Sequence, residues 1–260
     1  MNTLENKMVK LLIDLRENHK VVELKAEFET EAVRMNELMR LKEVADRAGL
    51  GLVIKIGGAE AITDMFEAQH IGVTGLIAPM IESPYAMTKY LEAIKKHFPE
   101  DLKKEIHFGV NIETYQGFQN LKEILSVKLI RLIDTVTLGR VDMSGSLGLG
   151  RDDINCDQLY EIAQSMFTLA KKKGLRTTMG GGIAVEAIPF IKKLVSKKLL
   201  DRFETRKIVF NVPSNFKKVE RGIIKANMFE LLWLQNKKNY YSAINIEDDN
   251  RIEMLRKRIK

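Results

Sequence analysis

Cysteine and long apolar segments are nearly absent from this sequence of 260 residues. Cys156 is its only cysteine, which excludes a framework of intrachain disulfides. No apolar run approaches the roughly 20 residues that span a bilayer, so we expect no membrane partner. The polar first segment also lacks the apolar core and cleavage site of a secretory signal. Together these absences predict a cytoplasmic protein.

Histidine is scarce as well, which bears on the choice of metal. The four histidines stand at positions 19, 70, 97 and 107, without the close spacing that is typical of zinc ligands. Cys156 has no partner motif that would complete a zinc site. The sequence therefore does not favour zinc.

Repeats and linkers are also missing, and this limits the domain organisation. The chain contains no repeat with a period of about 20 to 50 residues and no low-complexity tract. It also lacks a linker rich in proline, glycine or serine. We therefore expect one domain.

Strand-like and helical segments alternate along most of the chain. Leu4, Met8, Leu11 and Leu15 recur at helical spacing, so we expect a helix over residues 3–18. Strands are predicted at residues 21–29, 51–57, 75–82, 106–113, 135–142, 175–182 and 206–211. This rhythm predicts an α/β fold, a modified (β/α)8 TIM barrel, although seven strands are visible where a closed barrel requires eight. The single domain would comprise an N-terminal helix (1–20), the barrel core (21–212) and an extended helical C-terminus (213–260).

The C-terminal segment is more apolar than one helix on a barrel requires. Its apolar residues surround Trp233 and are Ile223, Ile224, Met228, Leu231, Leu232 and Leu234. One interpretation is a homo-oligomer that forms through the C-terminal helices. The other is a helix that closes the surface of its own barrel. Periodicity alone leaves both open.

The net charge of +7 favours anionic ligands but identifies none. The basic C-terminal end is not accompanied by a basic stripe interleaved with aromatic residues or by a recognised nucleic-acid-binding module. We therefore expect no nucleic-acid partner and a small anionic substrate.

Charged residues gather at the carboxyl ends of the predicted strands. In the first strand, Glu23, Lys25, Glu27 and Glu29 share one face because side chains alternate. Later strands end with Lys55, Glu82, Glu113, Arg140 and Asp142. Parallel barrel strands bring such positions together at one rim, where barrel enzymes have their active sites.

Two of these residues are candidate metal ligands. Glu113 and Asp142 offer hard carboxylate oxygens, which suit Mg²⁺ or Mn²⁺. By contrast, Arg202, Glu204 and Arg206 lie on the amino-terminal side of the last predicted strand, and Arg206 is its first residue. They are expected to form ion pairs at the opposite end of the barrel and are excluded from the site.

Three segments carry a resemblance to a known family. Ala78-Pro-Met-Ile-Glu-Ser83, Asn111-Ile-Glu-Thr114 and Gly139-Arg-Val-Asp-Met-Ser-Gly-Ser-Leu-Gly148 resemble the HpcH/HpaI aldolase and citrate lyase beta-subunit family in order and spacing. The likeness extends over about residues 21–211 as strand and helix rhythm. It implies a metal-dependent carbon–carbon lyase or aldolase that acts through a pyruvate-like enolate of a 2-oxo acid or acyl-thioester substrate.

The resemblance also implies roles for individual residues. Glu113 and Asp142 match the family's metal-binding carboxylates. Lys55 stands where the family usually has an arginine that stabilises the enolate oxygen, so the charge is kept and the paired donors are lost. Lys25-Ala-Glu-Phe-Glu29 stands where the family carries an acidic motif with a catalytic histidine. In its absence, Glu27 or Glu29 is the candidate base.

Four further residues are expected to bind substrate, and two other functions stay open. Glu82, Arg140, Ser144 and Gly181 are the predicted substrate-binding residues, with Arg140 as the partner of a second anionic group. Arg140 and the glycine-rich strand ends also motivate a mutase or isomerase of a phosphorylated acid. The missing histidine motivates a noncatalytic ligand-binding barrel.

Overall fold

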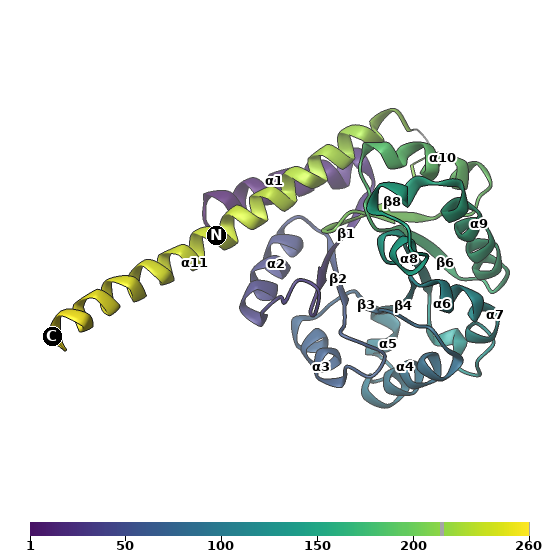
Figure 1. The fold of residues 1–260 in the computed structure, drawn as a ribbon, viewed down its shortest axis with the longest axis horizontal. Helices are drawn as coiled ribbons and strands as arrows, with labels where there is room; N and C mark the ends of the chain where they lie inside the picture. Colours follow the sequence, from purple (N-terminus) through teal and green to yellow (C-terminus); the bar gives the residue numbers. More distant parts are fainter. Residues whose placement is uncertain (214–215, 260) are drawn as a thin grey trace.

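Eight strands form a closed barrel that is surrounded by helices in the computed structural model, which describes residues 1–213 and 216–259 (Figure 1). The strands are β1 (Val21–Glu27), β2 (Gly51–Lys55), β3 (Gly75–Ala78), β4 (His107–Ile112), β5 (Thr135–Gly139), β6 (Arg176–Gly180), β7 (Arg202–Glu204) and β8 (Ile208–Asn211). The prediction of a modified TIM barrel is confirmed.

Helices connect most of the strands and continue to the C-terminus. The α-helices are α1 (Thr3–His19), α2 (Met35–Arg47), α3 (Ile62–Ile71), α4 (Pro84–His97), α5 (Leu102–Glu105), α6 (Tyr115–Gln119), α7 (Leu121–Ile124), α8 (Arg140–Ser146), α9 (Asp157–Lys172), α10 (Ile188–Ser196) and α11 (Val219–Arg258). Short 3-10 helices are η1 (Ile130–Leu132), η2 (Arg151–Asn155), η3 (Val185–Ala187) and η4 (Phe216–Lys218). Within the described part of the chain, no helix has both the length and the apolar character needed to cross a bilayer.

The eighth strand reverses the direction of the barrel. Strands β1 to β7 pair in parallel, whereas β8 is antiparallel to both β7 and β1. The last predicted strand, residues 206–211, corresponds to β8, and β7 is the strand that the sequence pattern did not reveal. A hairpin therefore stands where a regular barrel has a helical crossover, and the turn after Glu204 lies at the carboxyl ends of the parallel strands.

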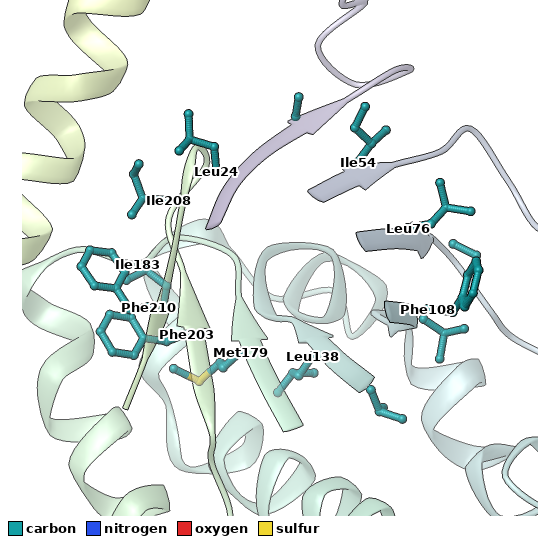
Figure 2. Close-up of a cluster of buried hydrophobic side chains, with 14 of the residues drawn as sticks. Leu24, Ile54, Leu76, Phe108, Leu138, Met179, Ile183, Phe203, Ile208 and Phe210 are labelled. Carbon is teal, nitrogen blue, oxygen red and sulfur yellow. The ribbon is translucent and has the colours of Figure 1, made fainter. Parts of the chain in front are cut away.

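The apolar core lies between the barrel and its helices, not inside the barrel. Leu24, Ile54 and Leu76 are fully buried on the outer face of their strands (Figure 2). Residues that alternate with them, such as Glu23, Lys25 and Glu27 of β1, are buried on the inner face. The interior of the barrel is thus polar, and this feature determines the character of the site.

Helix α11 begins against the body of the protein and then leaves it. Ile223, Ala226, Phe229 and Trp233 are buried, and the Lys225 ammonium pairs with Asp14 of α1. The second half of α11 projects away from the barrel (Figure 1). Ile224, Met228, Leu231 and Leu234 are each about half exposed. One face of α11 therefore closes the surface of its own barrel, while other apolar side chains of the same segment stay uncovered.

Candidate active site

A cavity of about 590 Å³ lies at the carboxyl ends of the parallel strands. Its lining includes six carboxylates (Glu27, Glu29, Glu113, Asp142, Glu204 and Glu230) and four cationic side chains (Lys25, Lys55, Arg151 and Arg206). With every group ionised, these side chains carry a formal charge of two negative. None of the described histidines lines the cavity.

Buried ion pairs form one wall of the cavity. Glu27 and Lys55 are register partners on β1 and β2, and Lys55 Nζ lies 3.0 Å from Glu27 Oε2. Lys25 Nζ lies 3.2 Å from Glu27 Oε1 and also pairs with Glu204 of β7. Burial raises the pKa of Glu27, but the charges of Lys25 and Lys55 outweigh it and lower this pKa to about 2. Glu27 is therefore held as a carboxylate at neutral pH.

Among the described residues, Glu113 is a buried carboxylate that forms no ion pair. It follows β4, is 3 % exposed, and accepts hydrogen bonds from the Met80 backbone N–H (3.1 Å) and Asn111 Nδ2 (3.0 Å). No ion pair joins Glu113 to a described lysine or arginine. Burial raises its pKa, the charge of Lys55 lowers it, and the nearby charge of Asp142 raises it further.

Asp142 reaches the same cavity from a helix. The sequence pattern placed it at the end of a strand, on the same face as Arg140. That prediction is wrong, because β5 ends at Gly139 and α8 begins at Arg140. Residues two apart on a helix point in different directions. Asp142 is exposed and lines the cavity, whereas Arg140 is fully buried.

Arg140 is a positioning residue and not a wall of the cavity. Its guanidinium donates five hydrogen bonds, to the carbonyl oxygens of Gly180, Gly181, Gly182 and Ile154 and to Asn155 Oδ1. Its carbon Cζ also lies 5.2 Å from the ring centroid of Phe190. Burial lowers its pKa to about 10. The predicted contact with a second anionic group is wrong, because these acceptors occupy the guanidinium.

Glycines make room for the carboxylates and for α8. A Cβ on Gly139 would lie 2.4 Å from Glu113 Oε2 and 2.9 Å from Glu113 Cβ. Gly181 lines the cavity with φ at +77°, and a Cβ there would lie 2.7 Å from the backbone nitrogens of Arg140 and Val141. These positions require glycine for close packing.

The remaining predicted residues fall on both sides of the cavity boundary. Glu29 is exposed and lines the cavity beside Gly57. Ser144 is buried and donates to the Gly150 carbonyl oxygen (2.8 Å). Glu82 is exposed and accepts from Thr114 Oγ1 (2.6 Å). The structure thus brings Glu27, Glu29, Lys55, Glu113, Asp142 and Gly181 to one cavity and leaves Glu82, Arg140 and Ser144 outside its lining.

Some lining residues were not among the predicted site residues. Glu204 and Arg206 were placed at the opposite end of the barrel, which is wrong for both, because β7, only three residues long, was not recognised. Lys25 could have been predicted as a site residue, because it lies on the charged face of the first strand. Asn227 and Glu230 come from α11, and nothing in the sequence indicates that this helix reaches the cavity.

A second polar cluster occupies the amino-terminal end of the barrel interior. Glu23 Oε1 lies 2.7 Å from His107 Nε2, and Glu23 Oε2 lies 2.7 Å from Arg202 Nη1. Arg202 is therefore part of an ion-pair network, as expected. His107 lies in the interior of the barrel, away from the cavity lining.

The donor set fits a hard divalent cation. Asn111 Oδ1 is buried and has no hydrogen-bond partner, and Asn111 lines the cavity beside Glu113. Among the described residues, no three His, Cys, Asp or Glu side chains converge as a metal site made by protein alone. Mg²⁺ is often bound through one or two carboxylates, with waters and substrate oxygens completing its shell. Glu113 and Asp142 meet that requirement.

Several solved structures share this fold, and their names include an aldolase and a citrate synthase. An HpcH/HpaI aldolase from Desulfitobacterium hafniense DCB-2 has a TM-score of 0.61 at 16% identity, covering 79% of this chain and 83% of that one. The citrate synthase SbnG has a TM-score of 0.62 at 17% identity, covering 89% of this chain and 90% of that one. Macrophomate synthase has a TM-score of 0.57 at 13% identity, covering 91% of this chain and 82% of that one. At these identities the likeness shows the fold alone.

Comparison at the level of sequence assigns the family. A search of curated proteins gave no match. The profile of the family described as HpcH/HpaI aldolase/citrate lyase matches residues 19–180, which is more than half of the chain. This match includes β1 to β6 and both candidate metal-binding carboxylates. The chain belongs to the HpcH/HpaI aldolase/citrate lyase family.

Proposed function

We propose that this protein is a divalent-metal-dependent carbon–carbon lyase or aldolase that acts through the enolate of a 2-oxo acid or an acyl thioester. One observation carries the proposal. Glu113 and Asp142 line the same cavity, and neither forms an ion pair with a described lysine or arginine. Two acidic groups left unpaired in a cavity of net negative charge favour a cation between them and the substrate.

Glu113 and Asp142 would hold the metal, with Mg²⁺ or Mn²⁺ as the ion. When bound, such a cation supplies a Lewis acid that stabilises the negative charge of an enolate. Met80 and Asn111 donate to Glu113 and keep its carboxylate in position. Asn111 Oδ1 offers a further acceptor to a substrate hydroxyl or a bound water.

Lys55, whose charge acts on Glu113, would stabilise the developing oxyanion. Its ammonium is held by Glu27, so it is fixed before substrate arrives. A lysine acts here as a point charge, without the paired donors of an arginine.

Glu29 suits the role of general base better than Glu27 does. Glu27 is held ionised by two lysines, and its pKa of about 2 makes it a weak base. Glu29 lines the cavity and has no ion pair with a described residue. We therefore assign proton abstraction to Glu29 and the positioning of Lys55 to Glu27.

The names of the structural neighbours support carbon–carbon chemistry for this site, since they include an aldolase and a citrate synthase. The alternative of a mutase acting on a phosphorylated acid rested partly on Arg140. Because the Arg140 guanidinium binds backbone carbonyls, this basis is lost. The lyase is the better supported function.

We also propose a homo-oligomer that forms through α11. Exposed apolar side chains along this helix include Met228 (51 %), Leu231 (56 %) and Ile246 (61 %). Uncovered apolar surface on a protruding helix favours association with another chain. A second copy of this protein is the proposed partner, with no part for nucleic acid or membrane.

The enolate proposal is tested by proton exchange. Wild-type protein with Mg²⁺ or Mn²⁺ is expected to exchange the methyl protons of pyruvate for deuterium, as measured by NMR. Glu113→Gln should abolish the exchange. Glu82→Gln, a matched change of a carboxylate outside the cavity, should leave it unchanged. Absence of metal-dependent exchange with any 2-oxo acid tested would count against the proposal.

A further inference from the structure

Arg151 differs from every other cationic side chain that lines the cavity. The other three have acidic partners: Lys25 pairs with Glu27 and Glu204, Lys55 with Glu27, and Arg206 with Glu31. Arg151 forms no hydrogen bond or ion pair within the described residues. Arg151 is thus an exposed cationic residue of the lining with no acidic partner among the described residues.

The backbone that carries Arg151 is firmly anchored. The Gly150 carbonyl oxygen accepts from Ser144 Oγ (2.8 Å), and the Gly150 N–H donates to Asp153 Oδ2 (2.9 Å). At the other end of η2, Arg140 donates to the Ile154 carbonyl oxygen and to Asn155 Oδ1.

These anchors connect η2 to the helix that carries the candidate metal ligand. Ser144 and Arg140 both belong to α8, as does Asp142. The start of η2 is therefore held in a defined relation to Asp142. This gives the two buried residues Arg140 and Ser144 a role at the site although neither lines it.

A guanidinium on an anchored loop is suited to bind a carboxylate or phosphate through paired donors. The cavity has room for more than pyruvate, because about 590 Å³ falls within the usual range of ligand sites. Glu113 and Asp142 are assigned to the metal, so a metal held by these two carboxylates and the guanidinium of Arg151 would serve different ends of one substrate.

Resting on the proposed function, we infer that Arg151 is a specificity residue that binds a second anionic group of the substrate, a carboxylate or a phosphate. This group lies on the half of the substrate remote from the enolate. The preferred substrates are thus dianions, and a monoanion such as pyruvate occupies only the metal-side half of the cavity.

The test compares binding of one-charge and two-charge probes to the full chain in the presence of Mg²⁺. Dissociation constants for pyruvate, 2-oxoglutarate and phosphonopyruvate are measured by calorimetry on wild type and Arg151→Gln. Arg131→Gln is the matched control, since Arg131 is an exposed arginine of η1 outside the cavity. If Arg151→Gln weakens the binding of 2-oxoglutarate more, the second anionic group is a carboxylate. If it weakens the binding of phosphonopyruvate more, the group is phosphate-like.

We expect Arg151→Gln to weaken the binding of at least one dianion by about tenfold to a hundredfold, which is the effect of losing a hydrogen bond between charged groups. Pyruvate binding should change less than twofold, and Arg131→Gln should change nothing. Equal loss for pyruvate and both dianions, or no loss for either dianion, overturns the role of Arg151. If pyruvate exchange is metal-dependent while this result is negative, the lyase proposal stands and the inference alone fails. If wild type binds none of the probes, both fail.

Discussion

At the residue scale, the site depends on how buried charges are compensated. Lys25, Glu27, Lys55 and Glu204 form a chain of alternating charge along the inner face of the barrel. A buried charge that loses its partner is costly, because the remaining group has neither water nor a counterion. Glu27 touches both lysines, so it is the residue on which this wall depends most.

Glu27→Gln should therefore destabilise the protein by on the order of 3 kcal/mol, because Lys55 loses its acidic partner and Lys25 keeps only Glu204. Chemical unfolding at pH 7 measures this difference. Glu29→Gln changes an exposed glutamate of the same strand end and should stay within about 0.5 kcal/mol of wild type. Equal stability of Glu27→Gln and wild type would show that the ion pairs contribute little.

Glu27 also makes the stability of the protein depend on pH. The folded-state pKa of Glu27 is about 2, below its ordinary value of 4.5. A carboxyl with a lowered folded-state pKa stabilises the protein above the ordinary value, and this contribution is lost as the pH falls toward the folded value. The stability gap between wild type and Glu27→Gln should be constant from pH 7 to pH 5 and narrow between about pH 4.5 and 2. A gap that widens on acidification would contradict the assignment.

Gly139 gives a test of how backbone spacing controls the metal-binding carboxylate. A Cβ at this position would collide with Glu113, whose side chain must then move. We expect Gly139→Ala to weaken Mn²⁺ binding about tenfold, the lower end of effects from residues that orient ligands. Gly145→Ala, at an exposed position of α8 with no atom within 4 Å of the new Cβ, is the control for a calorimetric titration. Unchanged affinity in Gly139→Ala would mean that Glu113 is not a ligand.

Single residues were predictable where alternation and spacing decide their position. The charged inner face of the first strand follows from the two-residue period, and Glu113 follows from an apolar run that ends in a carboxylate. The packing of Arg140 did not follow. Because α8 begins directly after Gly139, the Arg140 side chain points toward backbone carbonyls that lie far along the chain. No local sequence pattern predicts hydrogen-bond acceptors that are so distant in sequence.

At the element scale, short and irregular elements define the site. Strand β7 has three residues and β8 runs backwards, so neither carries the signal of a standard strand and helix unit. This is why Glu204 was assigned to the wrong end of the barrel. A long regular element such as α1 was predictable, because the helical spacing of its apolar residues is a local pattern.

The prediction at the element scale concerns the removal of the distal part of helix α11. Tyr241 donates to Glu37, and no ion pair or hydrogen bond joins the described residues 242–259 to the barrel. Truncation after Tyr241 should therefore leave the unfolding temperature within a few degrees of wild type. If α11 mediates the proposed oligomer, light scattering should show fewer chains per particle for the truncated protein than for the full chain. An unchanged number of chains per particle would remove these residues from the interface.

At the scale of the whole molecule, the barrel was predictable because alternation of strands and helices is written along the sequence. The polar interior and the reversed last strand were not, since both depend on contacts between distant segments. The arrangement that results collects charges from β1, β2, β4, β7 and α8 in one cavity. Its central consequence is that Glu113 and Asp142, unpaired by any described lysine or arginine, are available to a divalent cation.

Direct binding of Mn²⁺ tests this claim. Electron paramagnetic resonance titration of wild-type protein should reveal one bound Mn²⁺ per chain, competed by Mg²⁺. Glu113→Gln and Asp142→Asn should each weaken the affinity at least about tenfold, because each removes one of two charged ligands. Wild-type affinity in both variants, or no Mn²⁺ bound by the wild-type protein, would contradict the account.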